Sequence, residues 1–469
     1  MARRATGGSR CVWQEAQIPD EVIDRAEAFR GIEPRGRSEI IACMTVGESL
    51  QSDSVTTSRP SPERLNASFW RLCSASAASN LADGIVKVGL PLVAVGLTDS
   101  PVLVAGVAMA FSLPWLLVAL PAGALVDRLD RRKVMLAANT LRAALFGATA
   151  LAVTLGVTSI WLLYVVAFGA GVAETLYDTS AQSILPQVVA RDVLPQANGR
   201  LHFVELAANQ FVGPPLAGFL VAGGAALAVA GPAGLWAVAV AALLLVRGRF
   251  RVERDRPTAL RADITEGLRF LWRHRLLRTL AVMVGGSNFT TSAVLAVLVL
   301  YAVGSDSAMG LTEPGYGLLL TALAGGIMLG SLVAARIERW LGRPLSLGTS
   351  LLACAAVVGI PALSTNPFVL GAVFLAGGVL IATWNVITVS LRQLITPDRL
   401  LGRVNSGYRM LAWGSLPLGA AAGGLLAEWF GLRAVFAIMG VLALSLLLGM
   451  FWVTDSAIHA AERDADRQE

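Results

Sequence analysis

The chain has 469 residues, of which 55% are hydrophobic and only 15% are charged, and its formal net charge at pH 7 is +6. A soluble protein of this length carries roughly a quarter charged residues to cover its surface, so this composition excludes an ordinary soluble domain. The positive charges lie in short stretches between apolar runs of about 20 residues, the length of a bilayer-spanning helix. That placement is typical of membrane-protein loops and argues against nucleic acid as a partner.

The first 66 residues form a polar, charged segment without an apolar stretch long enough for a secretory signal. We predict a disordered cytoplasmic tail at residues 1–66. An alternative is that translation begins at Met44, so that residues 1–43 would be absent from the mature protein. The sequence does not distinguish the two.

Twelve apolar segments follow the tail, each long enough to cross about 30 Å of hydrocarbon as an α-helix. Helices are the expected form because backbone polar groups in lipid must pair internally. We therefore predict an all-α integral membrane protein, with six spans in residues 67–247, a cytoplasmic linker at 248–276, six spans in 277–455 and a cytoplasmic C-terminal tail at 456–469. The predicted spans are 70–96, 101–126, 134–157, 159–183, 202–222, 224–247, 277–303, 314–337, 346–364, 367–391, 404–428 and 432–455.

Arginine and lysine are concentrated in the even-numbered connections between these spans. The odd-numbered connections hold almost none, Arg433 beside the last one being the exception. Because basic residues favour cytoplasmic loops, every even-numbered connection is predicted to be cytoplasmic. An even number of spans then places both termini in the cytoplasm, in a multi-pass protein of the cell membrane.

Short sequence echoes relate the two halves of the chain. Leu185-Pro186-Gln187 precedes Asp192-Val193-Leu194 after the fourth span, and Leu391-Arg392-Gln393 precedes Asp398-Arg399-Leu400 after the tenth. Leu, Gln, Asp and Leu recur at one constant offset. An internal duplication of this kind is typical of transporters whose binding site lies at the repeat interface, near the bilayer midplane.

The stretch from Gly123 to Lys133 resembles the signature loop of the major facilitator superfamily, G-x-x-x-D-R-x-G-R-[RK]-[RK], with Asp130 where the family usually has glycine. A second stretch resembles the antiporter motif of the fifth helix, G-x-x-x-G-P-x-x-G-G. The segments 80–84 and 397–404 are similar to an exporter branch that holds siderophore and macrolide efflux proteins. The fifth-helix motif matches at Gly213, Pro214 and Gly218, while Asn209 and Ala217 replace glycines.

This resemblance covers residues 68–455 and implies two pseudo-symmetric six-helix bundles that transport by alternating access. The exporter branch implies efflux of drugs or small amphipathic metabolites in exchange for protons, and we expect a monomer. A proton-coupled uptake carrier and a non-transporting membrane sensor are the alternatives. The signature loop is implied to clamp the cytoplasmic helix ends between the halves, with gating residues Gly123, Asp127, Arg128, Arg131 and Arg132.

Ionisable side chains inside the spans are the candidates for proton coupling, because each costs at least ~2.5–3.5 kcal/mol to insert. In one interpretation a carboxylate of the first half is the proton site. In the other, Asp83 and Lys87 form a fixed ion pair and the other groups cap helix ends. Arg409 is the clearest charge expected to be buried in the second half. The candidates in the first half are Asp83, Lys87, Arg142, Glu174, Asp178 and Glu205.

Two further features leave alternatives open. The Gly213-Pro214-Pro215 break permits either close helix packing or a conformational hinge. Four tryptophans could line a cavity, although contacts with lipid or neighbouring helices are commoner for this residue type. They are Trp115, Trp236, Trp384 and Trp413.

Other functional classes lack their motifs. Lys87 and Lys133 do not follow glycine, so no phosphate-binding loop of an ATP-driven pump is present. The three histidines are far apart, no HExxH or GxSxG motif falls where it could act, and the four cysteines have no CxxC spacing. We therefore predict no catalytic residues, no metal and no cofactor, with transport of a small molecule driven by the proton gradient.

Overall fold

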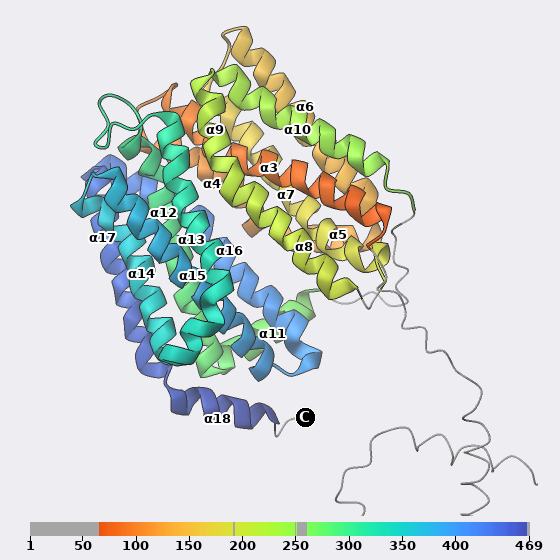
Figure 1. Ribbon diagram of the computed structural model, residues 1–469, viewed down its shortest axis with the longest axis vertical. Coiled ribbons are helices and arrows are strands. Elements are labelled where there is room, and N and C mark those ends of the chain that lie inside the picture. Colours follow the sequence, from red (N-terminus) through yellow and green to blue (C-terminus); the bar gives the residue numbers. More distant parts are fainter. Residues whose placement is uncertain (1–64, 191–192, 249, 251–259, 467–469) are drawn as a thin grey trace, which may run out of the picture. The chain divides into compact units, whose positions relative to one another are not determined.

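The computed structural model describes residues 65–190, 193–248, 250 and 260–466 (Figure 1). The predicted tail at 1–66, with the alternative start at Met44, lies outside this part except for its last two residues. Residues 251–259 of the predicted linker and residues 467–469 of the C-terminal tail lie outside it too. The described part is built of helices, and its only β-pairing is one isolated bridge between Val303 and Leu311.

The helices fall into a first and a second group of spans, followed by a short terminal helix (Figure 1). The first group is α3 (Ala67–Val95), α4 (Pro101–Leu117), α5 (Ala119–Arg128), α6 (Arg131–Thr154), α7 (Ile160–Val188), α8 (Leu194–Leu206), the π-helical η3 (Ala207–Val212), α9 (Gly213–Ala222) and α10 (Ala225–Leu244). After α11 (Leu260–Arg273), the second group is α12 (Arg275–Ala302), α13 (Glu313–Leu341), α14 (Arg343–Leu363), α15 (Pro367–Ile395), α16 (Asp398–Phe430), α17 (Leu432–Ser445) and the 3₁₀-helical η4 (Leu446–Trp452). The chain continues into α18 (Asp455–Asp466).

Ten helices of the described part are long and apolar enough to cross a membrane. The other two predicted spans, 101–126 and 202–222, were expected as single helices, and that expectation is wrong. The first divides at Val118, because Pro121 has no N–H to donate to the Leu117 carbonyl. The second begins earlier, at Leu194, and contains the π-helix, since Pro214 and Pro215 cannot donate to the carbonyls four residues before them.

Helices pack in the same pairs within the two halves. In the first half α3 contacts α9, α4 contacts α7 and α6 contacts α10; in the second half α12 contacts α16, α13 contacts α15 and α14 contacts α17. Between the halves, α4 packs on α16 and α9 packs on α13. The two contacts are equivalent, because each joins the second span of one half to the fifth span of the other. This pattern supports the internal duplication inferred from the sequence echoes.

The apolar core is joined at one end of the helices and divided at the other. We call the end that holds residues 130–133, 339–343 and 400–403 the basic end. A single core cluster away from the basic end contains residues of both halves, such as Val104 and Ala420. Near the basic end each half has a core of its own, one around Phe69 and one around Leu277. The halves are therefore packed together at the end opposite the basic end and separate toward the basic end.

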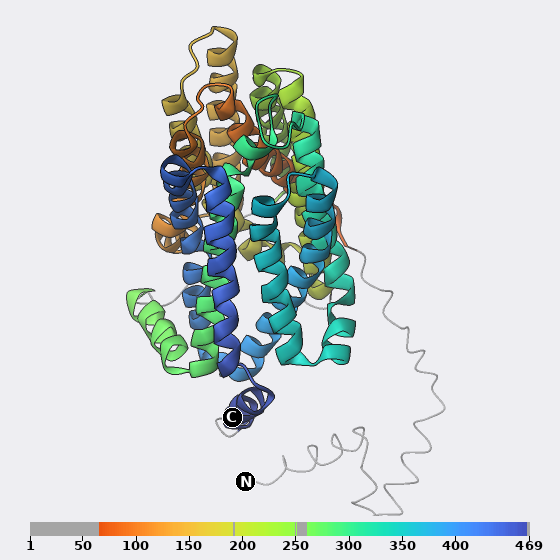
Figure 2. The ribbon, with the colours of Figure 1, turned by 90° about the vertical axis from the view of Figure 1, so that its left-hand side faces the viewer.

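Two amphipathic helices lie in segments that were predicted only as a polar linker and a tail. In α11, Leu271 is fully buried, and Glu266 pairs with Arg403 of α16. In α18, which lies beyond the basic end of the second half (Figure 2), Ile458 is buried and Glu462 forms a 2.5 Å ion pair with Arg343. Hydropathy missed both helices because each carries many charged residues and only one of its faces is apolar.

Candidate functional site

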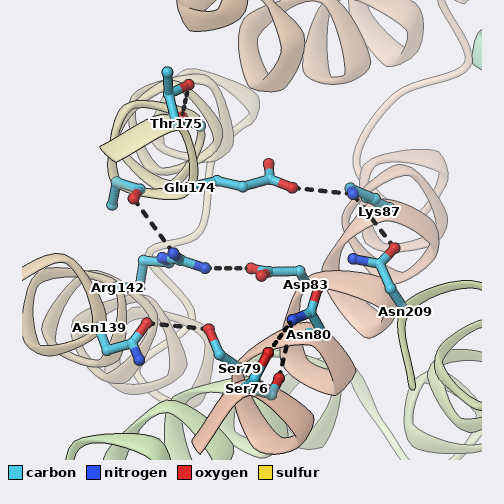
Figure 3. Close-up of polar contacts among 12 residues, drawn as sticks. Ser76, Ser79, Asn80, Asp83, Lys87, Asn139, Arg142, Glu174, Thr175 and Asn209 are labelled. Atoms are coloured by element: carbon cyan, nitrogen blue, oxygen red, sulfur yellow. Dashed lines mark hydrogen bonds and ion pairs between the residues drawn. The ribbon is translucent and has the colours of Figure 1, made fainter. Parts of the chain in front are cut away.

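A buried ion pair of the first half joins α3 and α6. The Arg142 guanidinium lies 2.5 Å from an Asp83 carboxylate oxygen, and the two residues are 0% and 1% exposed (Figure 3). Arg142 also donates to the Ala173 carbonyl at 3.3 Å. Its guanidinium packs 5.1 Å from the ring centroid of Tyr177 and 5.4 Å from that of Trp236. Because both charges are buried and paired, this contact ties α3, α6, α7 and α10 together.

A second pair joins α3 to α7 and to the π-helix. Lys87 lies 3.0 Å from Glu174 and donates to the Asn209 side chain at 3.3 Å (Figure 3). The proposed fixed pair of Asp83 with Lys87 is therefore wrong: the two residues are one turn apart on α3 but each binds a different helix. In the sequence, Asn209 was noted only as a substituted position of the fifth-helix motif. In the structure its side chain accepts a hydrogen bond from Lys87. Only the fold could show this, because 122 residues separate the two partners.

A cavity of about 340 Å³ lies beside this pair, between the two halves. Its walls carry three carboxylates, those of Glu174, Asp178 and Glu205, together with Lys87. Glu205 lies 3.7 Å from His202. Asp178, by contrast, forms no hydrogen bond or ion pair with any residue the structure describes. The cavity wall of the first half is thus rich in acidic groups, one of which has no direct partner in the described part of the chain.

Glu174, Asp178 and Gln182 form a polar stripe along α7, since residues four apart lie on one helix face. Glu174 binds Lys87 of its own half, whereas Gln182 accepts a 3.3 Å hydrogen bond from Arg409 of the second half. Asp178 lies between these two. Arg409 was expected to be buried, but it is exposed, and it lines an adjoining cavity of about 190 Å³. Gln182 was not among the candidates in the sequence because its side chain is not ionisable.

The two cavities meet at an aromatic pair contributed by both halves. Trp115 and Trp413 line both cavities, with ring centroids 4.2 Å apart in an edge-on arrangement. The Arg409 guanidinium lies 4.4 Å from the Trp413 ring centroid. Trp236 and Trp384 are buried among helices of their own halves instead. Two of the four tryptophans thus line the space between the halves.

The signature loop contacts the end of the sixth span. Arg132 donates to the carbonyls of Leu243 and Leu244 at 2.9 and 3.0 Å, which satisfies the C-terminal end of α10. Arg131 donates to the Phe250 carbonyl at 3.3 Å and is buried. These contacts join the loop to α10 and to the chain that follows it. Gly123 and Asp127 lie on α5, and Arg128 is the exposed last residue of that helix.

Asp130, the residue that departs from the family pattern, has a defined structural role. Its side chain accepts hydrogen bonds from the backbone N–H of Lys133 at 3.3 Å and of Phe250 at 3.1 Å. It is therefore the N-cap of α6, and it also fixes the chain that leaves α10. A glycine at this position would provide neither bond.

The fifth-helix motif lies where backbones approach closely. A Cβ on Gly213 would lie 2.7 Å from the Cα of Gly84, and one on Gly218 would lie 2.8 Å from the Cα of Pro314 in α13. The carbonyl of Phe211, released by Pro215, accepts a 3.4 Å hydrogen bond from Thr321 of α13. Motif residues thus permit close packing of the fifth span on α3 and on the second half.

At the end opposite the basic end, the α4–α16 contact is equally close. A Cβ on Gly424 would lie 2.9 Å from the Ala105 Cβ and 3.1 Å from the Val102 Cα. Ser100 of the first half donates to Glu428 of the second at 3.3 Å. These contacts close this end, so the cavities between the halves approach the molecular surface toward the basic end.

Two duplicated six-helix halves with a cavity between them, and a buried ion pair within the first half, have the architecture of a membrane transporter. The family model described as "Transmembrane secretion effector" matches residues 57–468. The chain belongs to this family of major facilitator transporters. It is a transporter and not an enzyme.

Named relatives and solved structures agree with this assignment. A protein of Mycolicibacterium fortuitum named multidrug efflux pump Tap is 30% identical over 80% of this chain and 92% of its own length. A protein of the same name from Mycobacterium tuberculosis strain H37Rv is 30% identical over 76% of this chain and 85% of its own. The nucleoside transporter NupG matches with a TM-score of 0.67 at 14% identity, over 82% of this chain and 98% of that chain. A bacterial homologue of the human lysosomal transporter Spinster gives 0.61 at 12% identity, over 85% and 96%. These structures confirm the predicted major facilitator fold.

Proposed function

We propose that the protein exports aromatic organic cations across the cell membrane in exchange for protons. The observation that carries this proposal is the cavity between the halves, in which three carboxylates face an aromatic pair. A cation is attracted by the carboxylates, and a flat apolar body packs on the indole rings. Arg409 already stacks on Trp413, so this ring face accommodates a cation. Relatives named as multidrug efflux pumps support the direction of transport.

Asp178 is the proton acceptor in this scheme. Asp83 is sealed in its pair with Arg142, and Glu174 is held by Lys87, so each already has a compensating charge. Asp178 lines the cavity, forms no hydrogen bond or ion pair with a described residue, and lies one turn from the charge of Glu174. Because two nearby carboxylates repel each other, a proton is taken up most easily by the unpaired one.

The position of Asp178 also connects protonation to the relative movement of the halves. The neighbouring stripe residue Gln182 is bound by Arg409 of the second half, and Arg409 interacts electrostatically with Asp178. When Asp178 is ionised it attracts Arg409 and favours a bound substrate cation. When it is protonated both attractions weaken, which favours substrate release and rearrangement of this contact.

The basic end faces the cytoplasm in this proposal, because basic loops favour the cytoplasmic side. The closed end, with its contacts at Gly218, Gly424 and Ser100, then faces outward. The described arrangement corresponds to the state that takes up substrate from the cytoplasm. An alternating-access cycle would be completed by opening the end opposite the basic end and closing the basic end.

Inside-out vesicles with an imposed pH gradient test the proposal. A fluorescent monovalent cation such as ethidium is followed together with internal pH. One proton crossing one pH unit supplies about 1.4 kcal/mol, which supports a tenfold concentration ratio. One-to-one exchange of two monovalent cations moves no net charge, so accumulation should follow the pH gradient and be insensitive to the membrane potential.

Asp178→Asn is expected to abolish accumulation driven by the pH gradient while substrate–substrate exchange continues. Asp306→Asn, a matched change in the exposed loop before α13, should behave as the wild type. Retention of gradient-driven accumulation in Asp178→Asn would contradict the role of Asp178. Absence of flux for a broad panel of aromatic cations, from correctly folded protein, would contradict the export proposal as a whole.

A further inference from the structure

A third cavity lies on the outer side of the second half, near the basic end. It is a groove of about 600 Å³ between the start of α12 and the 3₁₀-helix η4. We call it the arginine groove. Its lining is Arg275, Arg278, Thr279, Val282, Met283, Ser445, Leu446, Leu448, Gly449 and Trp452.

The arginine groove is polar at its mouth and apolar in its depth. Arg275, Arg278 and Val282 follow one face of α12, because residues three, four and seven apart align on a helix. From Arg275 to Val282 the helix rises about 10 Å. On the opposite wall, the Trp452 ring lies 5.8 Å from the Arg275 guanidinium, and Leu448 lies about one turn deeper. The charge is thus confined to the end of the groove that lies nearest the basic end.

Helix α11 extends the basic mouth. A neighbouring groove of about 630 Å³ is lined by Arg269 and Arg273 of α11 and shares Arg278 with the first. Arg278 donates to the Trp272 carbonyl at 3.4 Å, which joins the two walls. Trp272 and Trp452 are each 46% exposed. Exposed tryptophans beside arginines are typical of the depth at which lipid headgroups lie.

The described part of the chain supplies no counter-charge at this mouth. Within the described part of the chain, no carboxylate forms an ion pair with Arg269, Arg273, Arg275 or Arg278. Two other arginines of the basic end differ in this respect: Arg343 is paired with two glutamates and Arg403 with Glu266. Four clustered guanidinium groups therefore lack an anion that the described chain could supply.

We propose that the arginine groove binds an anionic phospholipid. Arg275 and Arg278 bind its phosphate. A planar guanidinium group is suited to this because it can donate two parallel hydrogen bonds to one phosphate. An acyl chain lies along Val282 and Leu448, and the mouth lined by α11 accommodates the remainder of the headgroup. Basic pockets between helices on the cytoplasmic side recognise lipids in this way. The groove lies outside the space between the halves, so this ligand is distinct from the transported solute.

An anionic lipid fits the groove better than a zwitterionic lipid or a soluble phosphate compound does. A zwitterionic lipid brings its own cation into a cluster of arginines and gains little net attraction. A soluble phosphate compound satisfies the arginines but leaves the apolar depth exposed to lipid or water. Arginines that form no ion pair with a described carboxylate, beside an apolar wall about 10 Å deep, are matched by a lipid with a negatively charged headgroup.

Native mass spectrometry of the purified full-length protein in detergent tests this assignment. The protein is titrated with phosphatidylglycerol and with phosphatidylcholine of identical acyl chains. The wild type is expected to retain phosphatidylglycerol preferentially. The double change Arg275→Gln with Arg278→Gln should weaken phosphatidylglycerol binding about 30-fold and leave phosphatidylcholine binding unchanged.

Two further variants separate the groove from a general effect of charge. Val282→Trp fills the apolar wall while both arginines remain, and it should also weaken phosphatidylglycerol binding; Val282 is exposed, so the fold tolerates the change. Arg336→Gln with Arg339→Gln removes the same charge from α13, outside both grooves, and should bind as the wild type.

Three results would overturn the assignment. The wild type could bind the two lipids equally, or the α13 control could lose as much binding as the groove variant. Glycerol phosphate could also compete as well as phosphatidylglycerol, which would indicate a site for free phosphate. None of these readouts depends on transport, so they remain decisive whether or not the export proposal holds.

Discussion

Replacing Asp83 by asparagine would leave the Arg142 guanidinium buried without a counter-charge. Both side chains are at most 2% exposed, so water cannot take the place of the lost carboxylate. Breaking a buried pair by removing one partner costs about 3–5 kcal/mol, mostly because the remaining charge stays desolvated. We expect Asp83→Asn to lower the free energy of unfolding by this amount.

The matched comparison is Glu174→Gln, which breaks the other ion pair of α3. The Lys87 side chain is 41% exposed, so solvent stabilises the released ammonium group. The loss should therefore be smaller than the about 3–5 kcal/mol expected for the sealed pair, even though the Glu174 side chain is only 5% exposed. The double variant Asp83→Asn with Arg142→Gln removes both buried charges. It should lose less stability than the sum of the losses measured for Asp83→Asn alone and for Arg142→Gln alone.

Unfolding can be followed by circular dichroism in mixed micelles, with a denaturing detergent as the titrant. The expected order of stability is wild type, Glu174→Gln and then Asp83→Asn. If Asp83→Asn were as stable as Glu174→Gln, the buried pair would not anchor the first half. Strict additivity in the double variant would show that Asp83 and Arg142 do not interact energetically.

Three other predictions follow from the contacts at the two ends and in the cavity. Gly424→Leu should prevent α16 from packing closely on the α4 backbone and so open the end opposite the basic end. A cysteine introduced at Leu416 in the cavity should then react faster with an impermeant maleimide added from outside. An unchanged reaction rate would contradict the assignment of this end as closed. Trp413→Ala should raise the KM for an aromatic cation about tenfold through the loss of ring stacking, with a smaller effect on an aliphatic cation. Burial alone would raise the pKa of Glu462, but hydrogen bonds from Arg343 and His459 outweigh it and lower the pKa. The ion pair of Glu462 should therefore hold α18 in place fully above about pH 4.3, the ordinary pKa of a glutamate, and release it as the pH falls through the lower pKa of Glu462 in the folded protein. Hydrogen exchange of the α18 amides would detect the release. Release already near pH 6 would argue against this role.

The order of spans, the membrane class and the family could be predicted from the sequence alone. Each apolar run is long enough to satisfy the bilayer by itself, so spans can be recognised without knowing their neighbours. The candidate charges could be found for the same reason, because Asp83, Arg142 and Glu174 are conspicuous inside apolar runs. The basic loops likewise follow from local composition.

The partners of those charges depended on the tertiary structure. Asp83 is four residues from Lys87, yet it binds Arg142, because in the packed bundle Asp83 lies against α6, whereas Lys87, one turn further along α3, reaches Glu174 of α7. The interruptions of the second and fifth spans and the amphipathic helices α11 and α18 also escaped hydropathy. They arise from individual prolines and from one-sided packing, which an average over a segment does not resolve.

The sequence by itself determined what could enter the membrane and where charge was unusual, because insertion is a property of each segment and its solvent. Only the tertiary structure decided which charges are neutralised and which remain available. Asp178 and Glu174 both carry a carboxyl group and lie one turn apart on α7, but only Glu174 forms an ion pair with a lysine among the described residues. The energy of a charge in a membrane depends on the groups within a few ångströms of it, and in this chain those groups come from helices far apart in the sequence.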